Sequence, residues 1–169
     1  RQVKQMLDSG VIQPSRAAWY SQVNLTPKPN GKWRFAIDYR SLNDCSDCTG
    51  WPIPNVYRML QRIGSKKAKF FGVMDLTSGF HQAPLDEKSR EFTAFITDTG
   101  VYEWLRVAMG LKGAPSHFQR ELAHRVLGPL LYNSLELYLD DIIVFGRTEE
   151  EYLTNLEAVF ERLRSHNVT

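Results

Sequence analysis

The chain has 169 residues, of which 43% are hydrophobic and 24% charged, and its formal net charge at pH 7 is +2. This length allows a buried core but no more than one domain or two small lobes. Charged residues interrupt the apolar runs, which are far shorter than the roughly 20 residues of a membrane-spanning helix. With no secretory leader recognisable in residues 1–10, we expect an intracellular protein without a membrane partner.

The first part of the chain is predicted to begin with a helix and a basic β-ribbon. Residues 1–9 place apolar side chains at helical spacing and are followed by Gly10, a typical helix C-cap. Residues 20–26 and 33–38 are β-type runs, and the Asn30-Gly31 pair between them is a strong hairpin signal. Because this ribbon carries several Lys and Arg residues, we expect its surface to be basic.

A second helix and further strands are predicted next. Asn55 can cap a helix whose apolar residues recur at helical spacing until Gly64 closes it. Residues 70–74 form an apolar run that leads into Asp75, and residues 91–107 are predicted to form a hairpin. We expect these strands to lie together in one central sheet.

The last third is predicted to hold a helix, a hairpin and a final helix. Residues 116–127 have helical spacing, and residues 135–145 form two β runs with Asp140-Asp141 at the hairpin tip. Thr148 can cap a helix that begins with three glutamates. We therefore predict an α+β fold with helices packed on one face of an antiparallel sheet.

The charge is unevenly distributed along the chain. Residues 1–70 carry 12 Lys and Arg against 4 Asp, whereas residues 71–169 carry 9 Lys and Arg against 15 Asp and Glu. A basic part suggests a polyanionic partner, and an acidic part with carboxylates at turns can hold cations, although two solvated faces would give the same counts. Cys45 and Cys48 lack a second pair of ligands, so we expect ordinary loop thiols.

The carboxylates at two turns suggest metal chemistry. Asp75 ends a predicted strand, and Asp140-Asp141 lie at a predicted hairpin tip. Nucleotide-joining enzymes use two metal ions about 4 Å apart, and Mg²⁺ often takes only one or two protein carboxylates together with water and phosphate. Taken alone, an aspartate at a strand end or an Asp-Asp pair in a hairpin is more often part of a solvated turn. The hypothesis of a two-metal site therefore depends on the order of these features along the chain, after a basic hairpin.

That ordered series resembles the reverse transcriptases of gypsy-type LTR retrotransposons over essentially the whole chain. The stretches that carry the resemblance are VIQPS at 11–15, KWRF at 32–35, DYRSLN at 38–43, WPIP at 51–54, DLTSGFHQ at 75–82, GLKGAP at 110–115 before FQ at 118–119, and YLDDIIVF at 138–145. The resemblance implies the fingers and palm of a right-hand polymerase, with residues 1–70 rich in fingers and 71–169 rich in palm. We expect the thumb and ribonuclease H to be absent from this segment.

The resemblance also implies roles for individual residues. Asp75 and Asp140 would bind two Mg²⁺ ions, with Mn²⁺ as an alternative, assisted by the carbonyl of Leu76 and by Asp141. Phe80 would collide with a ribose 2′ hydroxyl and so select deoxynucleotides. The residues implied around the incoming nucleotide are Lys28, Arg34, Ser78, Gly79, Phe80 and Met109, and those implied at the template and primer are Gln119 and Tyr138.

The resemblance implies an RNA-directed DNA polymerase, a nucleotidyltransferase that extends a primer 3′ end by two-metal catalysis. Its partners would be an RNA or DNA template with primer, deoxynucleoside triphosphates, and the thumb, ribonuclease H and integrase of a retroelement polyprotein, in cytoplasmic particles. Two alternatives remain open. One is a polymerase that copies RNA into RNA, against which Phe80 argues, and the other is a catalytically silent nucleic-acid-binding remnant, which is expected to have lost a carboxylate.

Overall fold

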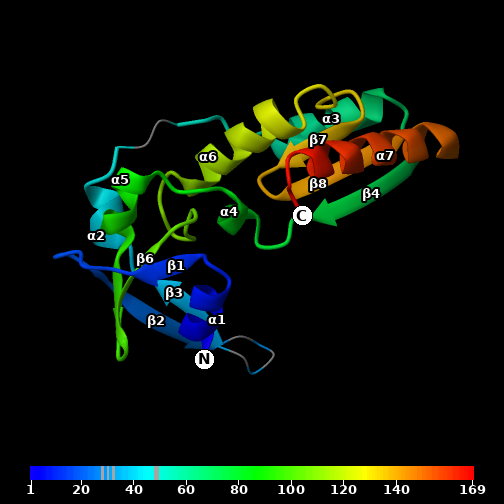
Figure 1. Cartoon of the computed structure of the whole chain (residues 1–169). Coiled ribbons are helices and arrows are strands. Elements are labelled where there is room, and N and C mark those ends of the chain that lie inside the picture. Colours follow the sequence, from blue (N-terminus) through cyan, green and yellow to red (C-terminus); the bar gives the residue numbers. More distant parts are fainter. Residues whose placement is uncertain (28, 30, 32, 48–49) are drawn as a thin grey trace. The chain divides into compact units, whose positions relative to one another are not determined.

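The computed structural model describes the chain except for residues 28, 30, 32, 48 and 49, and its elements are labelled in Figure 1. The chain divides into two compact units, each described here by itself. Unit 1 comprises Arg1–Cys48 and Phe80–Ala114, and unit 2 comprises Thr49–Gly79 and Pro115–Thr169. Each unit is built from two separate chain segments. A single division of the sequence near residue 70 therefore does not separate the two units. The assignment of the two parts to fingers and palm stays a prediction.

Unit 1 contains a five-stranded sheet with the strand order β1-β6-β5-β2-β3. Its strands are β1 (Ile12–Pro14), β2 (Ser21–Pro27), β3 (Trp33–Ile37), β5 (Phe95–Thr97) and β6 (Gly100–Trp104). Neighbouring strands are antiparallel except β2 and β5, which are parallel. The predicted pairing of residues 20–26 with 33–38 is confirmed by the β2–β3 hairpin, whereas Lys28, Asn30 and Lys32 in its turn lie outside the described residues and the basic surface stays a prediction.

A small aromatic core holds unit 1 together. Tyr39, Phe95 and Trp104 are buried with Ile12 and Ala108. The Tyr39 hydroxyl donates a hydrogen bond of 2.8 Å to the carbonyl of Thr93, and burial raises the pKa of that phenol. The helices of this unit are short: α1 (Gln2–Asp8), α2 (Arg40–Asp44), α5 (Glu87–Arg90) and the 3₁₀ helix η1 (Glu91–Thr93), with α4 (Gly79–Gln82) at the junction of the units.

Unit 2 contains a three-stranded antiparallel sheet with the order β4-β8-β7. Its strands are β4 (Phe70–Asp75), β7 (Leu135–Tyr138) and β8 (Asp141–Gly146). The prediction that β4 shares a sheet with the hairpin of residues 91–107 is wrong, because β4 pairs with β8 along its whole length while β5 and β6 belong to the sheet of unit 1. The first residues of that predicted hairpin form η1 instead of a strand.

The helices of unit 2 are α3 (Val56–Ser65), α6 (Ala114–Glu121), the π-helical segment η2 (Leu122–Val126) and α7 (Glu149–Ser165). Both predicted N-caps are confirmed, since Asn55 accepts a hydrogen bond from the N–H of Arg58 and Thr148 accepts one from the N–H of Glu151. Gly64 does not close α3, which continues to Ser65. Within the described part of the chain, no helix is both long enough and apolar enough to span a membrane.

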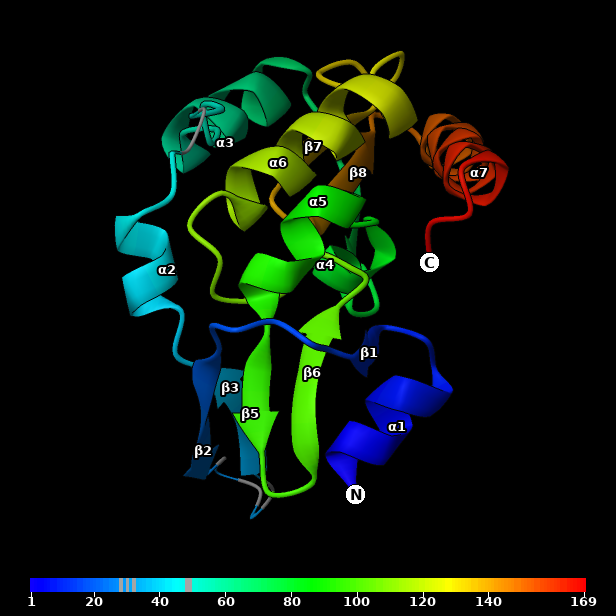
Figure 2. The same ribbon diagram turned by 60° about the vertical axis from the view of Figure 1, so that its left-hand side comes forward.

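The long helix α7 lies against β8 and β4, as Figure 1 shows, and Figure 2 shows α7 on the side of β8. Its first turns approach the sheet at two glycines. A Cβ atom at Gly146 would lie 2.5 Å from the backbone nitrogen of Tyr152, and one at Gly72 would collide with the Tyr152 hydroxyl. The Asn155 side chain then donates a hydrogen bond of 2.9 Å to the carbonyl of Phe145. The absence of side chains at both glycines therefore allows the helix to dock.

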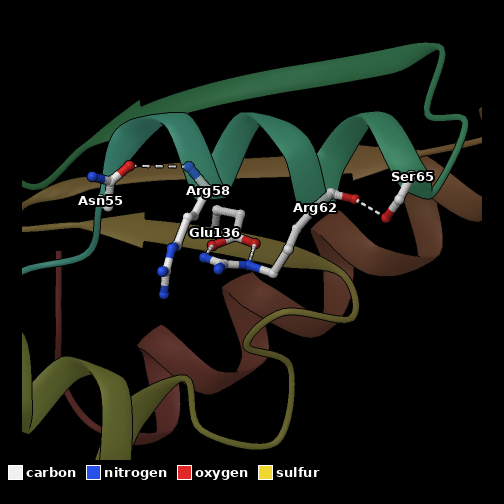
Figure 3. Close-up of polar contacts among 5 residues, drawn as sticks. All are labelled: Asn55, Arg58, Arg62, Ser65 and Glu136. Carbon is white, nitrogen blue, oxygen red and sulfur yellow. Dashed lines mark hydrogen bonds and ion pairs between the residues drawn. The ribbon is translucent and has the colours of Figure 1, made fainter.

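An ion pair with one buried partner joins α3 to β7 (Figure 3). Nε and Nη2 of Arg62 donate to the two carboxylate oxygens of Glu136 at 2.6 and 2.7 Å. The Glu136 side chain is 1% exposed, and the Arg62 guanidinium also lies over the ring of Tyr132. This bidentate contact fixes the helix against the strand that leads to the Asp140 turn.

Candidate active site

Three carboxylates lie at one end of the unit 2 sheet. Asp75 is the last residue of β4 and Asp141 is the first residue of β8, and the two are directly opposite each other in the antiparallel register. Directly opposed residues have Cα atoms about 4.5–5.5 Å apart. Asp140 immediately precedes Asp141 in the hairpin turn. Strand pairing thus brings Asp75 next to two aspartates that are remote from it in sequence.

The hairpin turn consists of Leu139 and Asp140, because Tyr138 is opposite Asp141 in the register. The predicted tip at Asp140-Asp141 is therefore wrong by one residue, since Asp141 already belongs to β8. Two-residue turns favour residues that tolerate positive φ, usually glycine or asparagine. Here Leu139 adopts φ 57°, a value that costs a leucine conformational energy.

The segment after Asp75 turns sharply toward α6. Leu76 is 4% exposed, and Ser78 has φ 51°. At the buried Gly79, a Cβ atom would lie 2.9 Å from the ring of Phe118 and 3.5 Å from the Cβ of Asp140. Glycine therefore allows the turn that follows one aspartate to lie close to another. Both aspartate-bearing turns contain a non-glycine residue at positive φ, as functional sites often do.

The carboxylates of Asp75, Asp140 and Asp141 have no hydrogen-bond or ion-pair partner among the described residues. Neighbouring carboxylates repel one another, and a divalent cation would relieve that repulsion. The described side chains do not form a group of three or more His, Cys, Asp or Glu residues that could hold a metal ion alone. An incomplete, oxygen-only set fits Mg²⁺ or Mn²⁺, which commonly complete their shells with water and substrate phosphates.

The residues expected at the template and primer lie beside this turn. Tyr138 is half-buried at the end of β7. Gln119 is only 2% exposed, and its Oε1 accepts a hydrogen bond of 2.6 Å from the N–H of Leu139. The contact that Gln119 makes is therefore internal to the protein. Its contact with a template, like that of Tyr138, stays a prediction.

The remaining residues expected at the nucleotide belong to unit 1. Arg34 is exposed on β3 opposite Thr26, Phe80 is half-buried in α4, and Met109 is 60% exposed. Lys28 lies outside the described residues. The roles expected for these four residues stay predictions.

One ion pair supports the region after the basic hairpin. Arg40 donates to both carboxylate oxygens of Asp38, at 2.8 and 2.6 Å. These hydrogen bonds lower the pKa of Asp38 from 3.8 to about 2. This ion pair joins residues that follow directly on β3, and the Arg34 guanidinium has no acidic partner among the described residues.

Two contacts near the carboxylates were not foreseen from the sequence. They are the Gln119–Leu139 hydrogen bond and the Arg62–Glu136 ion pair. Gln119 offers a signal, because it interrupts the apolar side of a helix, whereas the alternation of Leu135, Glu136 and Leu137 in a strand predicts that Glu136 faces solvent. A buried polar residue needs a partner, but periodicity alone does not identify that partner.

Comparison with known proteins places these features in a family. Residues 26–169 match the model of the family described as reverse transcriptase (RNA-dependent DNA polymerase). The chain is 40% identical over 172 residues to the retrovirus-related Pol polyprotein from transposon 297 of Drosophila melanogaster. It is 35% identical over 176 residues to that from transposon gypsy of the same species. Each alignment covers 99% of this chain and 16% of the polyprotein.

Solved structures share the fold. The chain resembles the prototype foamy virus protease-reverse transcriptase with a TM-score of 0.85 and 26% identity, over 97% of this chain and 21% of that one. It also resembles the foamy viral enzyme in complex with an RNA/DNA hybrid, with a TM-score of 0.86, 26% identity and the same coverage. These matches confirm the predicted α+β fold of a right-hand polymerase.

Proposed function

Since this chain belongs to the reverse transcriptase family, we propose that it is the segment of an RNA-directed DNA polymerase that carries the catalytic carboxylates. The observation that carries the proposal is the direct pairing of Asp75 with Asp141 beside the Asp140 turn. The chain spans about one sixth of the length of its curated relatives, so we propose the activity for a Pol polypeptide that carries this chain.

In the proposed site, Asp75 and Asp140 hold two Mg²⁺ ions, with the Leu76 carbonyl and Asp141 in support. When bound, such ions stabilise the attacking 3′ oxygen and the leaving pyrophosphate oxygen. The chain contributes the placement of the carboxylates, through the β4–β8 register and the turn at Leu139. The absence of any ion pair to these carboxylates among the described residues supports the assignment, because their charge is available to a cation.

The proposed nucleotide contacts come from several elements. The N–H groups of Ser78 and Gly79 face the triphosphate, and the positive φ of Ser78 gives a turn of the kind whose amides can bind anions. Arg34 and Lys28 bind the β- and γ-phosphates, where the planar guanidinium of arginine can donate two bonds. Phe80 excludes the ribose 2′ hydroxyl, and Met109 lines the sugar pocket.

The proposed partners are a primed RNA or DNA template, deoxynucleoside triphosphates and the rest of a retroelement polyprotein. A foamy viral relative was solved with an RNA/DNA hybrid and with double-stranded DNA. The curated relatives are Pol polyproteins of far greater length. Both facts support partners of these classes.

Primer extension tests the proposal. A Pol polypeptide that carries this chain is incubated with poly(rA)/oligo(dT), dTTP and Mg²⁺ or Mn²⁺, beside the variants Asp140→Asn and Asp98→Asn. Asp98 is an exposed turn residue of unit 1 and serves as the matched control. We expect extension by the parent and by Asp98→Asn, and a loss of at least about 100-fold in Asp140→Asn, since a metal ligand contributes several kcal/mol.

Two outcomes would count against the proposal. If Asp140→Asn and the parent extended the primer equally, the Asp140 carboxylate would not be needed for the reaction. A folded parent that binds the primer-template but extends it with neither metal would favour a catalytically silent nucleic-acid-binding protein. Binding is measured separately, by fluorescence anisotropy of a labelled primer-template.

A further inference from the structure

Helix α6 contacts both of the turns that carry aspartates, through two adjacent residues. Phe118 lies against Gly79, where a Cβ atom would be 2.9 Å from its ring. Gln119 accepts the hydrogen bond from the N–H of Leu139, the residue before Asp140. Both side chains are almost fully buried, at 3% and 2% exposure. One helix thus touches the segment after Asp75 and the turn at Asp140.

The Leu139–Asp140 turn requires such support. Leu139 occupies the left-handed region with φ 57°, where a branched side chain is disfavoured and glycine would be usual. A strained conformation persists only when its surroundings impose it. The Leu139 N–H donates a hydrogen bond of 2.6 Å to the buried amide oxygen of Gln119 on this helix. That bond links the conformation of the turn to the position of α6.

We infer that Gln119 is a positioning residue for Asp140: it holds the strained Leu139 backbone so that the neighbouring carboxylate stays beside Asp75. Gln119 acts through Leu139 and does not need to touch the nucleotide or the template. This inference rests on the proposed function, because it assigns a residue that orients the same carboxylate site.

The decisive variant is Gln119→Met, which removes the acceptor while keeping a side chain of similar length. Gln119 also borders a hollow of about 360 Å³ lined by Trp51 and His124, so a thioether can be accommodated there. Gln119→Glu is the conservative variant, since it keeps an acceptor oxygen. Leu122→Val is the matched control, because Leu122 is 2% exposed in the adjoining turn and packs in the core.

The first readout is amide hydrogen exchange at Leu139 in the 169-residue chain. We expect Gln119→Met to speed exchange about tenfold, the factor that corresponds to one hydrogen bond of ordinary net strength. Gln119→Glu should retain most of the protection. Leu122→Val should lower the melting temperature without a selective change at Leu139. Unchanged exchange at Leu139 in Gln119→Met would overturn the inference.

The second readout is steady-state primer extension by a Pol polypeptide that carries each variant. A positioning role predicts that Gln119→Met lowers kcat about tenfold, while KM for dTTP and Kd for the primer-template change less than about twofold. Faster exchange at Leu139 with an unchanged kcat would also overturn the inference. If the parent extends no primer, the proposed function fails, and the exchange comparison alone decides whether Gln119 holds the turn.

Discussion

At the scale of single residues, the arrangement of the carboxylate site depends on backbone positions where few side chains fit. Gly79 lies between Phe118 and Asp140, and Leu139 holds a positive φ beside the same aspartate. Neither position is polar or charged, so neither would be chosen as functional by chemistry alone. The reactive carboxylates are therefore oriented by neighbours whose contribution is steric.

Gly79→Ala tests that steric role. The added methyl group must displace the buried ring of Phe118, and overpacking of this kind costs about 1–3 kcal/mol. We expect a lower midpoint in urea unfolding and weaker primer extension. Gly64→Ala is the control, because Gly64 is helical with open space around its Cα, and alanine should stabilise that helix. Equal stability of the Gly79→Ala variant and the parent would contradict the close contact.

His81 gives unit 1 a predicted dependence on pH. Burial lowers the pKa of its imidazole, which stacks on Trp104, below the usual 6.5. The unfolded chain therefore binds the proton more readily than the folded one, so folding stability is greatest above about pH 6.5 and falls as the pH drops below it. Urea unfolding from pH 8 to pH 5 measures this slope. His81→Phe should flatten it, and an unchanged slope in that variant would show that other groups cause it.

At the scale of elements, close docking and one ion pair with a buried carboxylate organise the unit 2 sheet. Helix α7 reaches the sheet over Gly72 and Gly146, and α3 is held to β7 by Arg62 and Glu136. Strand β7 leads directly into the turn that carries Asp140. Helix α7 therefore fixes β4 and β8, and helix α3 fixes β7, the three strands that end at the carboxylate site.

The Arg62–Glu136 pair yields a prediction for stability. Arg62→Met leaves Glu136 as a buried, unpaired carboxylate and should cost about 3–5 kcal/mol of unfolding free energy. The double variant Arg62→Met with Glu136→Leu removes that buried charge and should recover most of the loss. Arg147→Met breaks an exposed pair with Glu151 and should lower the unfolding free energy far less than Arg62→Met does. Urea unfolding measures the unfolding free energy of all three variants. Equal losses of that free energy in Arg62→Met and Arg147→Met would contradict the difference in burial between the two ion pairs.

At the scale of the whole molecule, folding redistributes the charge that appears polarised along the sequence. Residues 1–70 carry a net +8 and residues 71–169 a net −6. Because each unit combines segments from both parts, unit 1 has 11 Lys and Arg against 9 Asp and Glu, and unit 2 has 10 of each. The basic half of the sequence therefore does not become a basic unit, and attraction of a polyanion depends on local surfaces instead.

Because each unit has buried residues of its own, we expect a core substitution to act mainly within its own unit. Leu137 is 1% exposed in the sheet of unit 2, and Leu137→Ala should cost about 2–5 kcal/mol. We expect faster amide exchange in β4, β7 and β8, with protection retained in β2, β3 and β6. Phe95→Ala, in the core of unit 1, should instead speed amide exchange in β2, β3 and β6 and leave β4, β7 and β8 protected. A uniform rise in exchange across both sheets would show instead that the chain opens as one cooperative unit.

Local patterns in the sequence determined the longer helices, the β2–β3 hairpin, both helix N-caps and the family, because propensity, capping and motif order are properties of neighbouring residues. Tertiary structure alone decided that β4 pairs with β8 and not with the β5–β6 hairpin, and that the tip is Leu139-Asp140. It also decided that Gln119 binds the Leu139 backbone and that Glu136 meets Arg62. The physical reason is that strand partners, register and the partners of buried polar groups depend on contacts between distant segments, which no local period encodes.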